Sequence, residues 1–189
     1  MSIIILGNGP SVLNNKYGYL IDTFDEVVRI NHYKPEKREY VGSKVTTYTT
    51  STYKTSFYKN VSKLADKILI WDQINCKNSP YDNCQKTEYL DVKKIESVLQ
   101  QKFGFNIFPN IPWCTTGVAI VEYFIQLGLY DFIYIYGFDY LRRNDQEHYF
   151  STNKIGWNPH SQILEENYFN FYLNNGTLKR LEDFMATQS

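Results

Sequence analysis

Short apolar segments alternate along this chain with longer segments of mixed polarity. The apolar segments are rich in Ile, Val, Tyr and Thr, which is typical of buried strands, whereas several mixed segments carry apolar residues at helical spacing. The predicted strands span residues 3–6, 26–30, 45–50, 67–71 and 132–136. The predicted helices span 57–65, 92–103, 162–173 and 178–185. A further helix is predicted to begin after a cap at Thr115 or Thr116 and to end at Gly128. Residues 17–24 fit either a helix or an irregular turn.

Two polar segments, 72–90 and 139–161, lack such periodicity and are predicted as loops, the first lying over one face of the sheet. Alternating strands and helices predict an α/β fold: a single Rossmann-like domain over residues 1–189, with a mostly parallel central sheet and helices on both faces. Ligands bind such sheets beyond the carboxyl ends of the strands. Polar and glycine-bearing segments follow three predicted strands in that position, namely 7–11, Asn31 and 137–139.

Composition and charge narrow the class of protein. The chain has 189 residues, with 20 basic and 20 acidic side chains. That length is sufficient for one domain with a substantial core, and the balanced charge argues against proteins that wrap nucleic acid or coat an anionic membrane. Three cysteines without zinc spacing favour a reducing compartment. No window approaches the ~20 apolar residues of a membrane span, so we expect no span. The chain opens MSIIILGNG, with no basic region and only four consecutive apolar residues, so we also expect no signal peptide and a cytoplasmic protein.

The first predicted strand runs directly into the turn Gly7-Asn8-Gly9-Pro10-Ser11. Two glycines allow a ligand to approach the backbone closely, and the Asn8 amide can donate and accept hydrogen bonds. The turn lacks the full dinucleotide fingerprint, because the third glycine would fall at Val12. The pattern therefore fits either a ligand-binding turn or a plain structural turn.

Further candidates lie later in the chain. Residues 112–117, Pro-Trp-Cys-Thr-Thr-Gly, precede a predicted helix, where hydroxyl and N–H groups form either an anion site or an ordinary cap. The chain has three histidines, His32, His148 and His160. Each fits a plain surface side chain, a general base, or, when protonated, a group that neutralises a leaving phosphate. No cluster has zinc spacing and no Asp-x-Asp pair is present to hold a divalent ion on a sugar nucleotide, so we expect no metal.

The order of these motifs resembles that of the metal-independent sialyltransferases, both the animal-type glycosyltransferase family 29 and the bacterial family 42. The first family motif is similar to residues 4–11, with further matches within 21–31 and at 40–44. The second is similar to 112–117 and 131–138, the third to 148–150, and the fourth to His160 with Glu165. All four occur in the family's order, and the match spans residues 3 to 165.

The resemblance implies a GT-A-like variant of the Rossmann-like sheet, a CMP-sialic acid donor or another CMP-linked acidic sugar such as Kdo, no cofactor, and a glycan or glycolipid acceptor. The fourth-motif histidine, His160, matches the proposed general base, and His148 lies with Tyr149 near the leaving phosphate. Glu165 either orients His160 or caps the helix that follows. The positions that match nucleotide- and donor-binding residues are Asn8, Gly9, Asn31, Thr115, Thr116, Gly117, Gly137, Phe138 and Tyr149.

The chain departs from the animal family at Ile3 and Tyr130, which correspond to the cysteines that join the first two motifs there. Thr115 replaces the usual serine and keeps the hydroxyl. The leading interpretation is an inverting, metal-independent glycosyltransferase. The alternatives are a CMP- or CMP-sugar-binding module or hydrolase that lacks transferase activity, and an ordinary α/β interaction protein.

Overall fold

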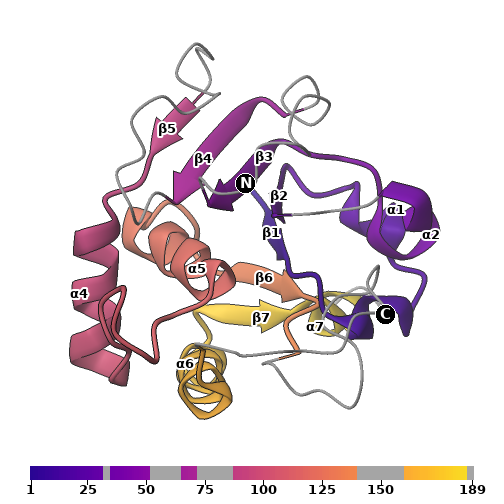
Figure 1. Ribbon diagram of the computed structural model, residues 1–189. Helices are drawn as coiled ribbons and strands as arrows, with labels where there is room; N and C mark the ends of the chain where they lie inside the picture. Colours follow the sequence, from indigo (N-terminus) through magenta and orange to yellow (C-terminus); the bar gives the residue numbers. More distant parts are fainter. Residues whose placement is uncertain (32–34, 52–64, 72–86, 140–159, 187–189) are drawn as a thin grey trace.

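A parallel β-sheet forms the centre of the protein (Figure 1). The computed structural model describes residues 1–31, 35–51, 65–71, 87–139 and 160–186. Its seven strands lie in the order β5-β4-β3-β2-β1-β6-β7, and every neighbouring pair is parallel. The strands are β1 (Ile3–Leu6), β2 (Glu26–Ile30), β3 (Thr47–Ser51), β4 (Lys67–Trp71), β5 (Thr87–Tyr89), β6 (Ile133–Tyr136) and β7 (Leu178–Arg180). The α/β, Rossmann-like fold expected from the sequence is confirmed.

Helical segments cover both faces of this sheet, because successive side chains of a strand point to opposite faces. On β1, Ile3 and Ile5 pack with one apolar cluster, and Ile4 and Leu6 pack with the other. The first face is covered by α4 (Val92–Phe103), α5 (Thr116–Leu127) and α6 (Gln162–Asn174). The second is covered by η1 (Pro10–Leu13), α1 (Gly18–Ile21), α2 (Arg38–Val41) and α7 (Leu181–Ala186), with η2 (Pro35–Lys37) directly before α2.

Helix ends follow the capping residues that the sequence carries. The Thr115 side chain, rather than that of Thr116, accepts a hydrogen bond from the Val118 N–H at 3.3 Å and caps α5. Ser161 caps α6 in the same manner. Gly128 ends α5 in the left-handed conformation, which glycine adopts without a Cβ penalty. The segment 17–24, left open between helix and turn, forms the single helical turn α1.

Two elements differ from the sequence-based predictions. Residues 87–89, expected to end a long loop, form β5 at the sheet edge beside Ile68–Ile70. Residues 178–180, expected to begin a helix, form β7 beside Ile133–Ile135, and only Leu181–Ala186 is helical. Both strands are three residues long, which is too short for a periodicity to show, so backbone pairing with an existing strand decides their structure. The predicted helix 57–65 falls outside the described residues except for Ala65, as do most of the two predicted loops.

None of the helices among the described residues combines the length and the apolar character that crossing a membrane requires.

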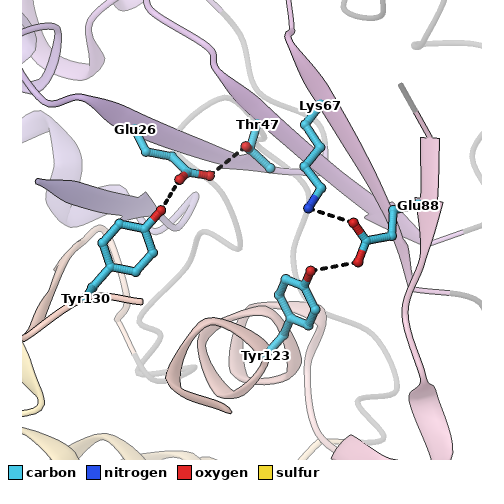
Figure 2. A network of polar contacts seen from close by, with 6 residues as sticks. All are labelled: Glu26, Thr47, Lys67, Glu88, Tyr123 and Tyr130. Carbon is cyan, nitrogen blue, oxygen red and sulfur yellow. Dashed lines mark hydrogen bonds and ion pairs between the residues drawn. The ribbon is translucent and has the colours of Figure 1, made fainter. Parts of the chain in front are cut away.

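A polar network joins the amino ends of the strands to α5 and the segment after it (Figure 2). Glu26 accepts hydrogen bonds from the Thr47 hydroxyl at 2.7 Å and from the Tyr130 hydroxyl. Beside it, Glu88 forms an ion pair with Lys67 at 2.6 Å and accepts a hydrogen bond from Tyr123 at 2.8 Å. Partial burial and the Glu26 carboxylate raise the pKa of Tyr130, so its hydroxyl remains a donor well into the alkaline range. This network connects the second half of α5 and the segment after it to the amino ends of the strands, opposite the carboxyl ends.

We expect Tyr130→Phe to lower the free energy of unfolding by about 1 kcal/mol, because the Glu26 carboxylate loses a donor in a partly buried place. Urea denaturation monitored by circular dichroism measures this change. The matched control is Tyr19→Phe, at a side chain that is 87% exposed. Equal denaturation midpoints for wild type and Tyr130→Phe would show that this hydrogen bond adds nothing to stability.

Candidate active site

The strand order places a topological switch point between β1 and β6. From β1 the chain continues to β2 on one side, whereas β6 continues to β7 on the other. Ligands of open α/β sheets bind beyond the carboxyl ends of the strands at such a point, because the connecting segments there turn away from each other. The segments that follow β1 and β6 are residues 7–11 and 137–139, two of those expected from the sequence to border a crevice.

These two segments lie backbone against backbone. The Gly9 N–H donates to the Gly137 carbonyl at 2.9 Å, and the Ser11 N–H donates to Oδ2 of Asp139 at 3.0 Å. A Cβ on Gly9 would lie 2.5 Å from the Asp139 carboxylate and 2.8 Å from the Gly137 carbonyl oxygen. Gly137 itself has a φ of +76°, which disfavours other residues. The glycine turn is therefore required by this close contact, whatever ligand it also meets.

The side chain of Asn8 contacts the residue that precedes Asn31. The Asn8 side-chain amide donates to the Ile30 carbonyl at 2.7 Å, directly before Asn31. The backbone of Asn31 has a φ of +52°. Its N–H donates to the Thr49 carbonyl, and its carbonyl accepts from the Tyr48 hydroxyl, both at 2.8 Å. Its Oδ1 atom is buried and has no hydrogen-bond partner in the part of the chain that the structure describes. A buried unpaired acceptor costs free energy, so this atom is suited to a donor group of a ligand.

The amino end of α5 contacts the segment that follows β6. Phe138 packs over Gly117, where a Cβ would lie 3.0 Å from its ring, and against Phe169 of α6 at a ring separation of 4.9 Å. The segment after β6 is thereby joined to the first turn of α5, which also contains Thr115 and Thr116. The positive end of the helix dipole and the N–H groups of a first turn favour an anion.

His160 lies directly before the α6 cap and contacts the segment that leads into α5. Its Nδ1 atom is 3.0 Å from the Trp113 carbonyl oxygen, and the Trp113 ring stands edge-on to the imidazole. A carbonyl oxygen only accepts, so Nδ1 carries the proton of the neutral ring and Nε2 keeps the lone pair. This tautomer leaves Nε2 as the atom that can remove a proton.

Two acidic residues take part in ways that the sequence analysis did not assign. Glu165 is buried and accepts a hydrogen bond from the Thr115 N–H at 3.3 Å. Its suggested role as the cap of its own helix is wrong, because Ser161 occupies that position. Asp139 holds the Ser11 N–H, as described above, although only its position after a strand had drawn attention to it. A cavity of about 340 Å³ opens beside Asp139 and is also lined by Arg180 and Glu182.

The remaining candidates, His32, His148 and Tyr149, lie outside the described residues. Within the described ranges, no group of three or more His, Cys, Asp and Glu side chains could hold a metal ion. Asn8, Gly9, Asn31, Thr115, Thr116, Gly117, Gly137, Phe138 and His160 all lie on the segments that the contacts above join.

Comparison with known proteins gives matches among solved structures only. No family model matches the sequence, and no curated protein matches it. A mammalian sialyltransferase, in complex with Gal-beta-1-3GalNAc-ortho-nitrophenol, is 18% identical with a TM-score of 0.63, over 95% of this chain and 68% of that one. The sialyltransferase CstII from Campylobacter jejuni, in complex with the substrate analogue CMP-3FNeuAc, is 21% identical with a TM-score of 0.67, over 96% and 82%. CstII in complex with cytidine-5'-monophosphate is 25% identical with a TM-score of 0.66, over 95% and 79%.

The structural neighbours of this chain are therefore sialyltransferases of both the mammalian and the bacterial kind, as the order of the sequence motifs implied. The chain has their GT-A-like variant of the Rossmann-like fold.

The contact between the two segments at the switch point can be tested by substitution. We expect Gly9→Ala to lower the free energy of unfolding by about 1–3 kcal/mol, because the new methyl group overlaps the Asp139 carboxylate. Thermal denaturation of the single variants and of Gly9→Ala/Asp139→Ala completes a double-mutant cycle. The cost of Gly9→Ala should be smaller when Asp139 is already alanine, and an equal cost in both backgrounds would contradict the overlap.

Proposed function

We propose that residues 1–189 form one catalytic domain, an inverting and metal-independent glycosyltransferase. It would transfer sialic acid, or a related acidic sugar, from a CMP-linked donor to a hydroxyl of a glycan or glycolipid. The observation that supports this proposal is that Asn8, Asn31, the first turn of α5 and His160 lie on segments joined by direct contacts at the carboxyl ends of β1 and β6. The fold that carries these segments is shared with the neighbouring sialyltransferases. The bound molecules in the neighbouring structures, CMP and CMP-3FNeuAc, support the donor class.

The donor would be bound by complementary polar groups on these joined segments. The unpaired Oδ1 of Asn31 would accept a hydrogen bond from a hydroxyl or amino group of the cytidine. Asn8, Gly9, Gly137 and Phe138 would line the nucleotide beside it. Thr115, Thr116 and Gly117, at the positive end of α5, would hold the phosphate or the sugar carboxylate.

Cleavage of the bond between the anomeric carbon and the phosphate oxygen would release CMP from such a donor, with an oxocarbenium-like sugar and negative charge developing on the CMP phosphate. In the absence of a cation, fixed dipoles and hydroxyl groups must stabilise that charge, and a preorganised set is effective because it need not reorient. The first turn of α5 would supply part of this stabilisation. His148 and Tyr149 would supply the rest, as their match to the third motif suggests.

The acceptor hydroxyl would attack the anomeric carbon from the face opposite the phosphate, which inverts the configuration. Nε2 of His160 would remove the hydroxyl proton as the new bond forms, since the Trp113 carbonyl holds the ring in the required tautomer. General-base assistance of this kind typically raises a rate by ~10²–10⁴-fold.

Donor binding is tested by a thermal-shift panel of CMP, CDP, UDP and GDP. We expect the cytidine nucleotides to raise the melting temperature of the wild type selectively, because a ligand stabilises the folded state that binds it.

The contribution of Asn31 is tested by calorimetry. Asn31→Ala should weaken CMP binding about 5- to 50-fold, which corresponds to the free energy of one buried hydrogen bond. Asn31→Gly, which adopts a positive φ without strain, should weaken it equally; exposed Asn14→Ala is the control. Unchanged affinity in both Asn31 variants would remove Asn31 from the donor site.

The role of His160 is tested by transfer from CMP-sialic acid to Gal-beta-1-3GalNAc-ortho-nitrophenol. We expect His160→Ala and His160→Asn to lower kcat at least ~10²-fold with little change in CMP affinity, since both lack the base. The asparagine amide can still donate to the Trp113 carbonyl, which separates loss of the base from loss of the contact.

The same assay includes a sample with EDTA, which should retain full activity. A strict requirement for Mn²⁺ or Mg²⁺ would refute metal independence, and normal turnover by both His160 variants would exclude that residue as the base. Selective CMP binding without transfer or release of sialic acid would instead indicate a binding module.

A further inference from the structure

Two hydrogen bonds join the segment before α5 to the start of α6. His160 Nδ1 donates to the Trp113 carbonyl at 3.0 Å, and the Thr115 N–H donates to Oε1 of Glu165 at 3.3 Å. On the first segment, Trp113 and Thr115 are two residues apart. On the second, the first turn of α6 separates His160 from Glu165. That turn is itself closed by the Glu165 N–H on the Ser161 carbonyl at 3.1 Å. The turn is therefore a short rigid connection between Glu165 and His160.

Glu165 is a buried carboxylate that accepts a hydrogen bond from the backbone. Its side chain is only 4% exposed and lies near the buried thiol of Cys114. Burial raises the pKa of Cys114 well above its usual range, and the Glu96 and Glu165 carboxylates raise it further. A buried carboxylate is costly unless it is hydrogen-bonded, and an apolar side chain would fill the same space at lower cost. Packing alone therefore does not explain a glutamate at this position.

We infer that Glu165 is a positioning residue, an inference that rests on the function proposed above. It holds the Thr115 backbone, which begins the donor-binding turn, at a constant distance from the base His160. Glu165 touches neither substrate in this assignment and acts through Thr115 and the first turn of α6. A general base must lie within hydrogen-bond reach of its proton, and a misplacement of ~1 Å can reduce a rate by ~10²-fold.

This role predicts a specific kinetic pattern. Without the Glu165 acceptor, the Thr115 hydroxyl still caps α5 and Phe138 still packs over Gly117, so the donor turn keeps its local structure. What changes is its distance from His160. We therefore expect a loss in kcat, by roughly 10- to 100-fold, with CMP affinity within about 3-fold of the wild type.

The test compares Glu165→Gln with Glu165→Met. Glutamine keeps a carbonyl oxygen that accepts from the Thr115 N–H, whereas methionine has a similar length and no such acceptor. We expect Glu165→Gln to retain kcat within about 3-fold and Glu165→Met to show the loss given above. The matched control is Glu166→Met, because Glu166 lies on the same helix and accepts from Gln162 there.

A second pair of variants removes the donor instead and guards against misfolding of Glu165→Met. Thr115 has a φ of −70°, which proline adopts, so Thr115→Pro deletes both the N–H and the capping hydroxyl at an unchanged φ. Thr115→Ala keeps the N–H and deletes only the hydroxyl. Adding Glu165→Met to Thr115→Pro should lower kcat no further, because both changes remove the same hydrogen bond.

The spectroscopic readout is the tautomer of His160, measured by ¹H–¹⁵N NMR. The chain has only three histidines, and His160→Asn identifies the signal. We expect the Nδ1–H tautomer in wild type and Glu165→Gln, and a mixture of tautomers in Glu165→Met. An unchanged kcat and tautomer in Glu165→Met, or equal losses in the methionine and glutamine variants, would overturn the inference. A wild type without transferase activity would refute the proposed function instead, and the tautomer would still test the contact.

Discussion

The contact on which the site depends is the backbone pairing between residues 7–11 and 137–139 at the carboxyl ends of β1 and β6. Glycine at positions 9 and 137 allows the two segments to touch, and the Gly9 N–H bond to the Gly137 carbonyl joins them. On one side, this contact places Asn8 against the end of β2. On the other side, it places Phe138 over the first turn of α5. The candidate donor site is thus formed by one close approach of two otherwise separate loops.

Several groups in the site are held in states that cost stability. Asn31 has a left-handed backbone and a buried acceptor without a partner in the described structure, and Glu165 is a buried carboxylate. Such costs are typical of functional sites, where the surrounding structure holds a group ready for a ligand. The parallel sheet supplies that support, since its strands are buried on both faces by two separate apolar clusters.

The resemblance to the animal family matches Ile3 and Tyr130 to two cysteines that form a disulfide there, and polar contacts connect the surroundings of these two positions here. Ile3 is fully buried and pairs in register with Glu26 of β2. Glu26 in turn accepts the hydroxyl of Tyr130, the second position matched to that disulfide. The segment of Tyr130 is thereby connected to β1 by way of the Glu26 carboxylate of β2.

The sequence by itself predicted β1, β2, β3, β4 and β6 from short segments rich in apolar and β-branched residues, and the helices α4, α5 and α6 from helical spacing and capping residues. Its motif order also indicated the family of folds and the positions that converge at the switch point; His148 and Tyr149 remain predictions from that order. Only the tertiary structure decided β5 and β7, because three residues carry no pattern and their partners are distant in sequence. It also decided the partner of Glu165, the tautomer of His160 and the unpaired acceptor of Asn31, since each depends on which backbone group lies opposite a side chain.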